Sequence, residues 1–122
     1  MRAVLLPFIE KKKRDGKMTY FRLKKEKDFQ KVFHKGKRLF SPSLTILYFP
    51  AERLKMGISI GKKHGKSVQR NRIKRLLREA FRLNREEIKG NYFIVLIPKV
   101  SEKYDFHTFN EHVKWMIKKG NL

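Results

Sequence analysis

The residues between Gly61 and Lys66 are the stretch of the chain best suited to binding phosphate, because they read GKKHGK and lead into a predicted helix. Ser67 follows as the expected cap of that helix, and unpaired N–H groups at a helix start attract anions. In the phosphate-binding loop of nucleotide hydrolases, the first glycine would stand where this chain has Ile60. The next predicted strand, 92–97, also ends without an acidic metal ligand. The loop therefore predicts phosphate binding without nucleotide hydrolysis.

Side chains that could cleave a phosphodiester bond are not clustered in the sequence. The aspartates are scattered, so no carboxylate group suggests chemistry by two metal ions. Two histidines share the predicted last helix, but their spacing of five points them in different directions. We therefore predict no catalytic residue and no metal site in the polypeptide. The side chains considered are Asp15, Asp28, Asp105, His34, His64, His107 and His112.

The helix that follows the loop has one apolar side and one densely cationic side. Its apolar stripe has the period of a helix lying on a core and consists of Ile73, Leu76, Leu77, Ala80 and Phe81. The opposite side places cations beside cations, which repel each other unless an anion lies against them. A row of guanidinium and ammonium groups suits a nucleic-acid backbone better than a small anion. This exposed side consists of Asn71, Lys74, Arg75, Arg78, Arg82 and Arg85.

Composition supports an anionic partner. The chain has 122 residues, a formal net charge of +21 and 40% hydrophobic residues, so it has room for one domain with a modest core. Such a charge predicts binding to nucleic acid or to an acidic membrane surface. We do not expect a membrane partner, because the basic helix needs its apolar stripe for its own core. The absence of cysteine excludes a disulfide framework and fits a cytoplasmic protein.

The N-terminal segment differs from the remainder. Residues 1–17 combine a short apolar patch, interrupted by Pro7, with a run of basic residues, and they fit neither a signal peptide nor a membrane helix. We interpret 1–17 as an N-terminal extension, either a mobile arm or a stretch before a working start at Met18. Residues 18–122 are predicted to form a single RNA-binding domain.

The remaining elements predict a mixed fold. A first helix over 25–34 carries Phe29 and Phe33 on one stripe, and aromatic residues at this spacing are typical of a core. Strands are expected at 37–40, 44–49, 55–61 and 92–97, and Asp105 should cap the last helix. The order is α-β-β-β-α-β-α, which predicts an α+β, two-layer α-β sandwich with a four-stranded sheet.

Two blocks carry a resemblance to a known family. The run KSVQRNRIKRLLREAF, preceded by GISIGKK, resembles the signature of the bacterial ribonuclease P protein component, whose hallmark is an Arg-Asn-Arg segment entering a basic helix. The block LKKEKDFQKVFHKG at 23–36 resembles the first helix of that family, and the likeness covers about 20–119. The resemblance implies a left-handed β-α-β crossover, although about 98% of such crossovers are right-handed.

The resemblance also implies a function. In this family the RNA subunit performs the chemistry with magnesium, and the protein helps to cleave precursor tRNA at the mature 5′ end. The implied partners are the catalytic RNA and precursor tRNA, with no obligate protein partner, and the 5′ leader would lie in a cleft lined by Phe29, Phe33 and Tyr48. The expected contacts to the catalytic RNA are Lys62, Lys63, Lys66, Arg70, Asn71, Arg72, Lys74, Arg75 and Arg78. Arg70 projects near the apolar stripe, so it should reach off the helix start.

A second interpretation stays open at this stage. A basic protein of the ribosomal type could bind structured RNA with no part in cleavage, and its composition would be similar. A DNA-binding module is less well supported, because the sequence shows no turn-helix pairing and no heptads.

Overall fold

The computed structural model describes residues 20–122, so the predicted extension at 1–17 lies outside the described residues. Helices and strands follow one another along the chain in the predicted order, with one additional short strand and two turns of 3-10 helix. The elements are β2 (Phe21–Arg22), α1 (Glu26–Lys35), β3 (Lys37–Phe40), β4 (Leu44–Pro50), β5 (Lys55–Ile58), η2 (Lys62–His64), α2 (Ser67–Leu83), η3 (Arg85–Glu87), β6 (Tyr92–Pro98) and α3 (Phe106–Gly120).

The sheet has five strands in the order β2-β5-β6-β4-β3, one more than the four expected. The additional strand, β2, has two residues and pairs in parallel with β5, with Phe21 opposite Lys55. At the centre, β6 pairs antiparallel with β4 and parallel with β5. Its residues Ile94, Val95 and Leu96 are buried, which agrees with the apolar run that predicted a central strand.

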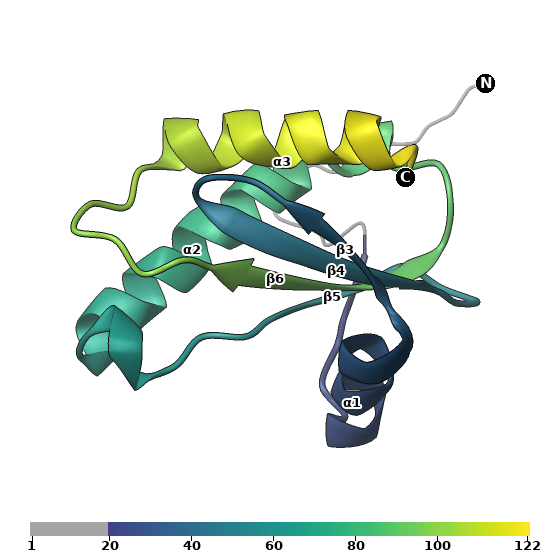
Figure 1. Ribbon diagram of the computed structural model, residues 1–122, viewed down its shortest axis with the longest axis horizontal. Coiled ribbons are helices and arrows are strands. Elements are labelled where there is room, and N and C mark those ends of the chain that lie inside the picture. The colour runs from purple at the N-terminus through teal and green to yellow at the C-terminus, as the bar shows by residue number, and fades with distance from the viewer. Residues whose placement is uncertain (1–19) are drawn as a thin grey trace.

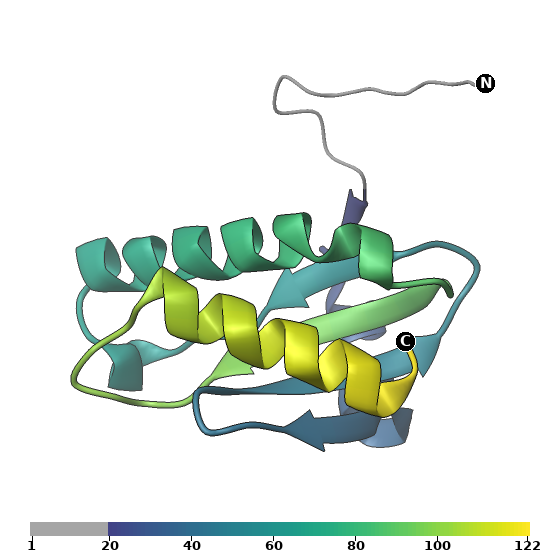
Figure 2. The ribbon, with the colours of Figure 1, turned by 90° about the horizontal axis from the view of Figure 1, so that it is seen from above.

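The connection from β5 through α2 to β6 joins two parallel neighbours. In Figure 2, α2 and α3 lie on the side of the sheet toward the reader, β5 lies nearer to α2 than β6 does, and both strands run from right to left. When the strands are turned to point upward, β6 lies to the left of β5, so the crossover is left-handed. The general preference for right-handed crossovers does not hold here.

Both faces of the sheet are covered, but unequally. Figure 1 shows α2 and α3 on one face and the shorter α1 on the other. The larger core cluster lies under α2 and α3 and contains Ile73, Leu77, Phe81 and Phe109. A smaller cluster lies under α1 and contains Leu23, Val32, Leu47 and Val95. The α+β fold class is therefore confirmed, and α1 adds a partial layer on the second face.

The starts of the two long helices differ. Asp105 caps α3 as predicted, because its carboxylate accepts hydrogen bonds from the backbone N–H and the hydroxyl of Thr108. The expected cap of α2 is wrong: Ser67 is the first helical residue, and Lys66 occupies the cap position without a side-chain hydrogen bond. The first N–H groups of α2 thus lack a side-chain cap at a helix end that favours anions.

Acid is expected to loosen the start of α3. The hydrogen bonds from Thr108 hold the pKa of the Asp105 carboxyl below its ordinary value of 3.8. A depressed pKa contributes stability that is present above 3.8 and is lost as the pH falls through the lower folded-state value. Thermal unfolding of wild type and Asp105→Asn, followed from neutral pH into acid, checks this. Asparagine keeps an accepting cap but cannot titrate, so the variant should lose less stability in acid than wild type. Equal losses of stability in the two proteins would contradict the prediction.

Candidate nucleic-acid interface

The predicted RNA contacts gather on one exposed stretch of the structure. The polar side of α2 leaves Asn71, Arg72 and Arg75 exposed, while Lys74 and Arg78 are half-buried. The lysines of η2 and of the α2 cap position are exposed beside the helix start. We call this set the basic surface: Lys62, Lys63, Lys66, Arg70, Asn71, Arg72, Lys74, Arg75 and Arg78.

The charge of the basic surface is not neutralised by acids of the described chain. In α2 the ion pair joins Arg82 to Glu79, and the hydrogen bond between them raises the pKa of Arg82. Within residues 20–122, no carboxylate pairs with a cation of the basic surface. These cations therefore remain available for an anionic partner, whose binding would relieve their mutual repulsion.

Arg70 is set apart from the other members. Its guanidinium Nη2 donates a hydrogen bond of 3.3 Å to the Ser67 hydroxyl, one turn back toward the helix start. Its Nε is buried and has no hydrogen-bond partner among the described residues. Arg70 thus lies along the first turn of α2, in keeping with its expected direction.

The loop before α2 is fixed by two residues. Gly65 has φ 107°, a left-handed conformation that favours glycine. The His64 ring lies between two carbonyl groups, with Nε2 at 2.8 Å from the Pro98 oxygen and Nδ1 at 3.3 Å from the Gly61 oxygen. His64 therefore ties the basic loop to the end of β6. This role could not be predicted from the sequence, because the shorter contact is to the backbone oxygen of Pro98, which is distant along the chain.

A second candidate surface lies on the α1 face of the sheet. The rings of Phe29 and Phe33 stack with centroids 6.4 Å apart and an interplanar angle of 24°. Both are half-buried and pack against the same cluster as Phe49 and Phe93, and the Lys55 ammonium lies 5.6 Å from the Phe93 centroid. We call these five residues the aromatic surface. Its rings could stack on unpaired bases, and its lysine could meet a phosphate.

Tyr48 does not belong to the aromatic surface, so its expected place beside Phe29 and Phe33 is wrong. Side chains alternate along β4, and Tyr48 packs with Ile46 against the larger cluster under α2 and α3. Its ring meets Tyr92 edge-on, with centroids 5.5 Å apart. Phe49 and Phe93, on the other face, are the aromatic residues that the sequence interpretation missed.

The two surfaces adjoin. A small hollow of about 130 Å³ between α2 and β5 is lined by Lys74 and Arg78 of the basic surface and by Phe29 of the aromatic surface. Tyr20 also lines this hollow. Burial raises the pKa of its hydroxyl, and the nearby positive charge of Arg78 offsets only part of that rise. An RNA on one surface would therefore lie close to an RNA on the other.

The described residues offer no metal centre. Within residues 20–122, no group of three His, Cys, Asp or Glu side chains could hold a metal ion. Over the same residues, no helix is both long enough and apolar enough to cross a membrane.

Comparison with known proteins places the chain in a family. The Ribonuclease P family model matches residues 19–121. The ribonuclease P protein component of Clostridium kluyveri is 41% identical over 111 residues, covering 86% of this chain and 98% of that protein. The same component of Clostridioides difficile is 40% identical over 104 residues, covering 82% and 91%. The solved RNase P protein of Thermotoga maritima gives a TM-score of 0.73 at 32% identity, covering 80% and 96%. The chain therefore belongs to the family of bacterial ribonuclease P protein components.

Proposed function

We propose that the chain serves ribonuclease P by holding two RNAs side by side, with the basic surface on the catalytic RNA and the aromatic surface on the 5′ leader of precursor tRNA. The role itself follows from the family: the chain is a subunit of the ribonucleoprotein endonuclease that matures the tRNA 5′ end. The observation that carries the assignment of surfaces is the row of cations in the basic surface, none of which pairs with an acid of the described chain. Binding of folded RNA supplies the missing negative charge.

The family also implies a division of labour between the protein and the RNA. As the family resemblance implies, we assign magnesium and the chemistry to the RNA subunit. The protein would then contribute orientation and charge, which bring the scissile phosphodiester to the catalytic RNA. We further propose that the subunit works in the cytoplasm without an obligate protein partner.

One assay separates this role from that of a structural RNA-binding protein. The full chain is added to its cognate catalytic RNA at low magnesium, and precursor tRNA cleavage is followed. We expect cleavage to rise, because the cations of the basic surface replace part of the charge screening that magnesium supplies. The protein alone should not cleave. Cleavage by the protein alone, or no rise in the presence of catalytic RNA, would contradict the proposal.

Gly57→Ala is expected to disturb the aromatic surface. A Cβ at this position of β5 would lie 2.5 Å from the Phe29 ring, so the ring would have to move. We expect weaker binding of precursor tRNA by the reconstituted ribonucleoprotein, with mature tRNA binding unchanged. Gly61→Ala is the matched control, because a Cβ there meets no atom within 4 Å. Equal behaviour of the two alanine variants would remove Phe29 from the leader site.

A further inference from the structure

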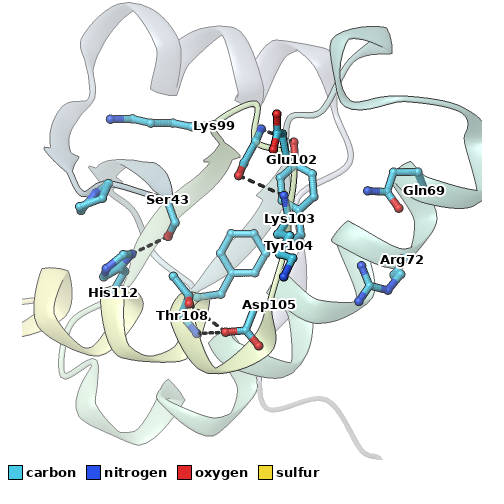
Figure 3. A pocket seen from close by; sticks show the side chains of 13 residues that line it. Ser43, Gln69, Arg72, Lys99, Glu102, Lys103, Tyr104, Asp105, Thr108 and His112 are labelled. Carbon is cyan, nitrogen blue, oxygen red and sulfur yellow. Dashed lines mark hydrogen bonds between the residues drawn. The ribbon is translucent and has the colours of Figure 1, made fainter.

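A larger hollow lies at the edge of the basic surface, on the side away from α1. It has a volume of about 870 Å³ and is bounded by the β3–β4 turn, the start of α2, the loop at 99–105 and the start of α3 (Figure 3). This volume falls in the range of roughly 300–1,000 Å³ that is usual for small-ligand sites. Its walls come from four separate segments, so its shape depends on the packing of α3 against α2.

Arg72 connects this hollow to the proposed RNA-docking surface. It is the last residue of the Arg-Asn-Arg segment, and its side chain also lines the hollow. Figure 3 shows Arg72 and Gln69 on the wall formed by α2, with Ser43 and His112 on the opposite side. An RNA that lies along α2 therefore passes the opening.

Charge at the hollow favours an anion. Arg72, Lys99 and Lys103 line the hollow, and the two lysines come from the loop between β6 and α3. Lys99 extends from the side of the hollow opposite Arg72 (Figure 3). Two acids also line the space, Glu102 and Asp105. The Asp105 carboxylate already accepts two hydrogen bonds from Thr108 at the start of α3, where the helix end offsets its charge. The three cations outnumber the two carboxylates, and one of those carboxylates, that of Asp105, is already hydrogen-bonded at the start of α3.

The lining also offers hydrogen-bonding groups that have no partner among the described residues. His112 Nδ1 lies 2.6 Å from the Ser43 hydroxyl oxygen, which leaves Nε2 without a partner among the described residues. The Gln69 amide, which combines two N–H donors with an oxygen acceptor, also has no hydrogen bond within residues 20–122. A ring nitrogen such as His112 Nε2, which can donate or accept a hydrogen bond, can pair with the edge of a nucleobase, whereas a phosphate oxygen only accepts.

We propose that this hollow takes one unpaired nucleotide of the catalytic RNA, with its phosphate near Arg72 and Lys103 and its base edge near His112 on the opposite side. The inference rests on the proposed function, because the RNA must first dock on the basic surface. The basic surface otherwise recognises the charge of the RNA backbone. The hollow would add a contact that recognises a single splayed-out nucleotide.

The test maps base accessibility in the catalytic RNA by chemical probing at single-nucleotide resolution, with the full chain bound. The pocket variant Lys103→Ala/His112→Ala should lose protection at one unpaired nucleotide, keep the other protections and bind about tenfold more weakly. The matched control His107→Ala/Lys118→Ala removes the same residue types from exposed positions of α3 outside the hollow, and it should behave as wild type. Lys103→Ala alone, a single exposed loop substitution, should lose the same protection and guards against misfolding of the double variant.

The outcomes separate the inference from the proposed function. Unchanged protections and affinity in the pocket variants would overturn the nucleotide site while leaving the docking surface intact. No protection by the wild-type chain at any nucleotide would instead overturn the docking itself. Equilibrium dialysis with free AMP, CMP, GMP and UMP tests whether the hollow binds a free nucleotide instead of a nucleotide of the RNA chain. Saturation by a free nucleotide at micromolar concentration would overturn the assignment to the RNA chain.

Discussion

Raising monovalent salt from about 50 to 200 mM is expected to weaken binding of the chain to its catalytic RNA by about 10³–10⁵-fold, if roughly six to ten phosphates are engaged. The reason is that each cation placed on a phosphate releases a condensed counterion, and added salt opposes that release. The nine residues of the basic surface, eight of them cationic, supply contacts in this range. Filter binding of the full chain to the RNA over a salt series measures the slope. A flat dependence would contradict the electrostatic account of the interface.

Charge removal at the loop makes this prediction specific to the basic surface. Replacing Lys62, Lys63 and Lys66 by alanine should reduce the slope of log affinity against log salt by about 2 to 3, since each lost phosphate contact removes about 0.7 to 0.9. The matched control replaces Lys114, Lys118 and Lys119, three exposed lysines of α3, and carries the same change in net charge. If both triple variants lowered the slope equally, total charge rather than the basic surface would govern binding.

The periodic parts of the fold were predictable because burial repeats with the period of the element. In α2 the residues Ile73, Leu77, Ala80 and Phe81 are all buried, as their stripe predicted, and the opposite side is polar. The unbroken apolar run of β6 likewise marked the strand with a neighbour on each side. The family resemblance supplied the left-handed crossover, which periodicity does not encode.

The errors arose where the sequence pattern carries no spatial information. Two residues are too few to show alternation, so β2 was missed. In β4 both sets of side chains are large and apolar, so alternation gave the two sets but not which one faces α1, and Tyr48 was placed on the wrong face. The cap of α2 differed by one residue, because a lysine can occupy that position without a side-chain hydrogen bond. The roles of His64 and Phe93 depend on contacts with Pro98 and Lys55, which are distant from them in the sequence.

The leader assignment predicts that Phe33→Ala weakens precursor tRNA binding by the reconstituted ribonucleoprotein and spares mature tRNA, which lacks the leader. Loss of one stacked base is worth about 1–3 kcal/mol and is tolerant of sequence, as a subunit that serves many leaders requires. Phe33 is half-buried and stacks on Phe29, so the substitution also removes packing under α1. The ratio of the two tRNA affinities is therefore the informative measurement, because a loss of folded protein lowers both affinities together.

Trp115→Ala provides the matched aromatic control for that ratio. Trp115 is 48% exposed on α3, on the opposite side of the sheet from Phe33, and its ring lies beneath the Lys119 ammonium at 4.7 Å. Removing it should leave the ratio of precursor to mature tRNA affinity unchanged, since no leader contact is assigned to α3. If Phe33→Ala lowered both tRNA affinities equally, the aromatic surface would be only a core contact of α1. The leader would then have to bind elsewhere on the chain.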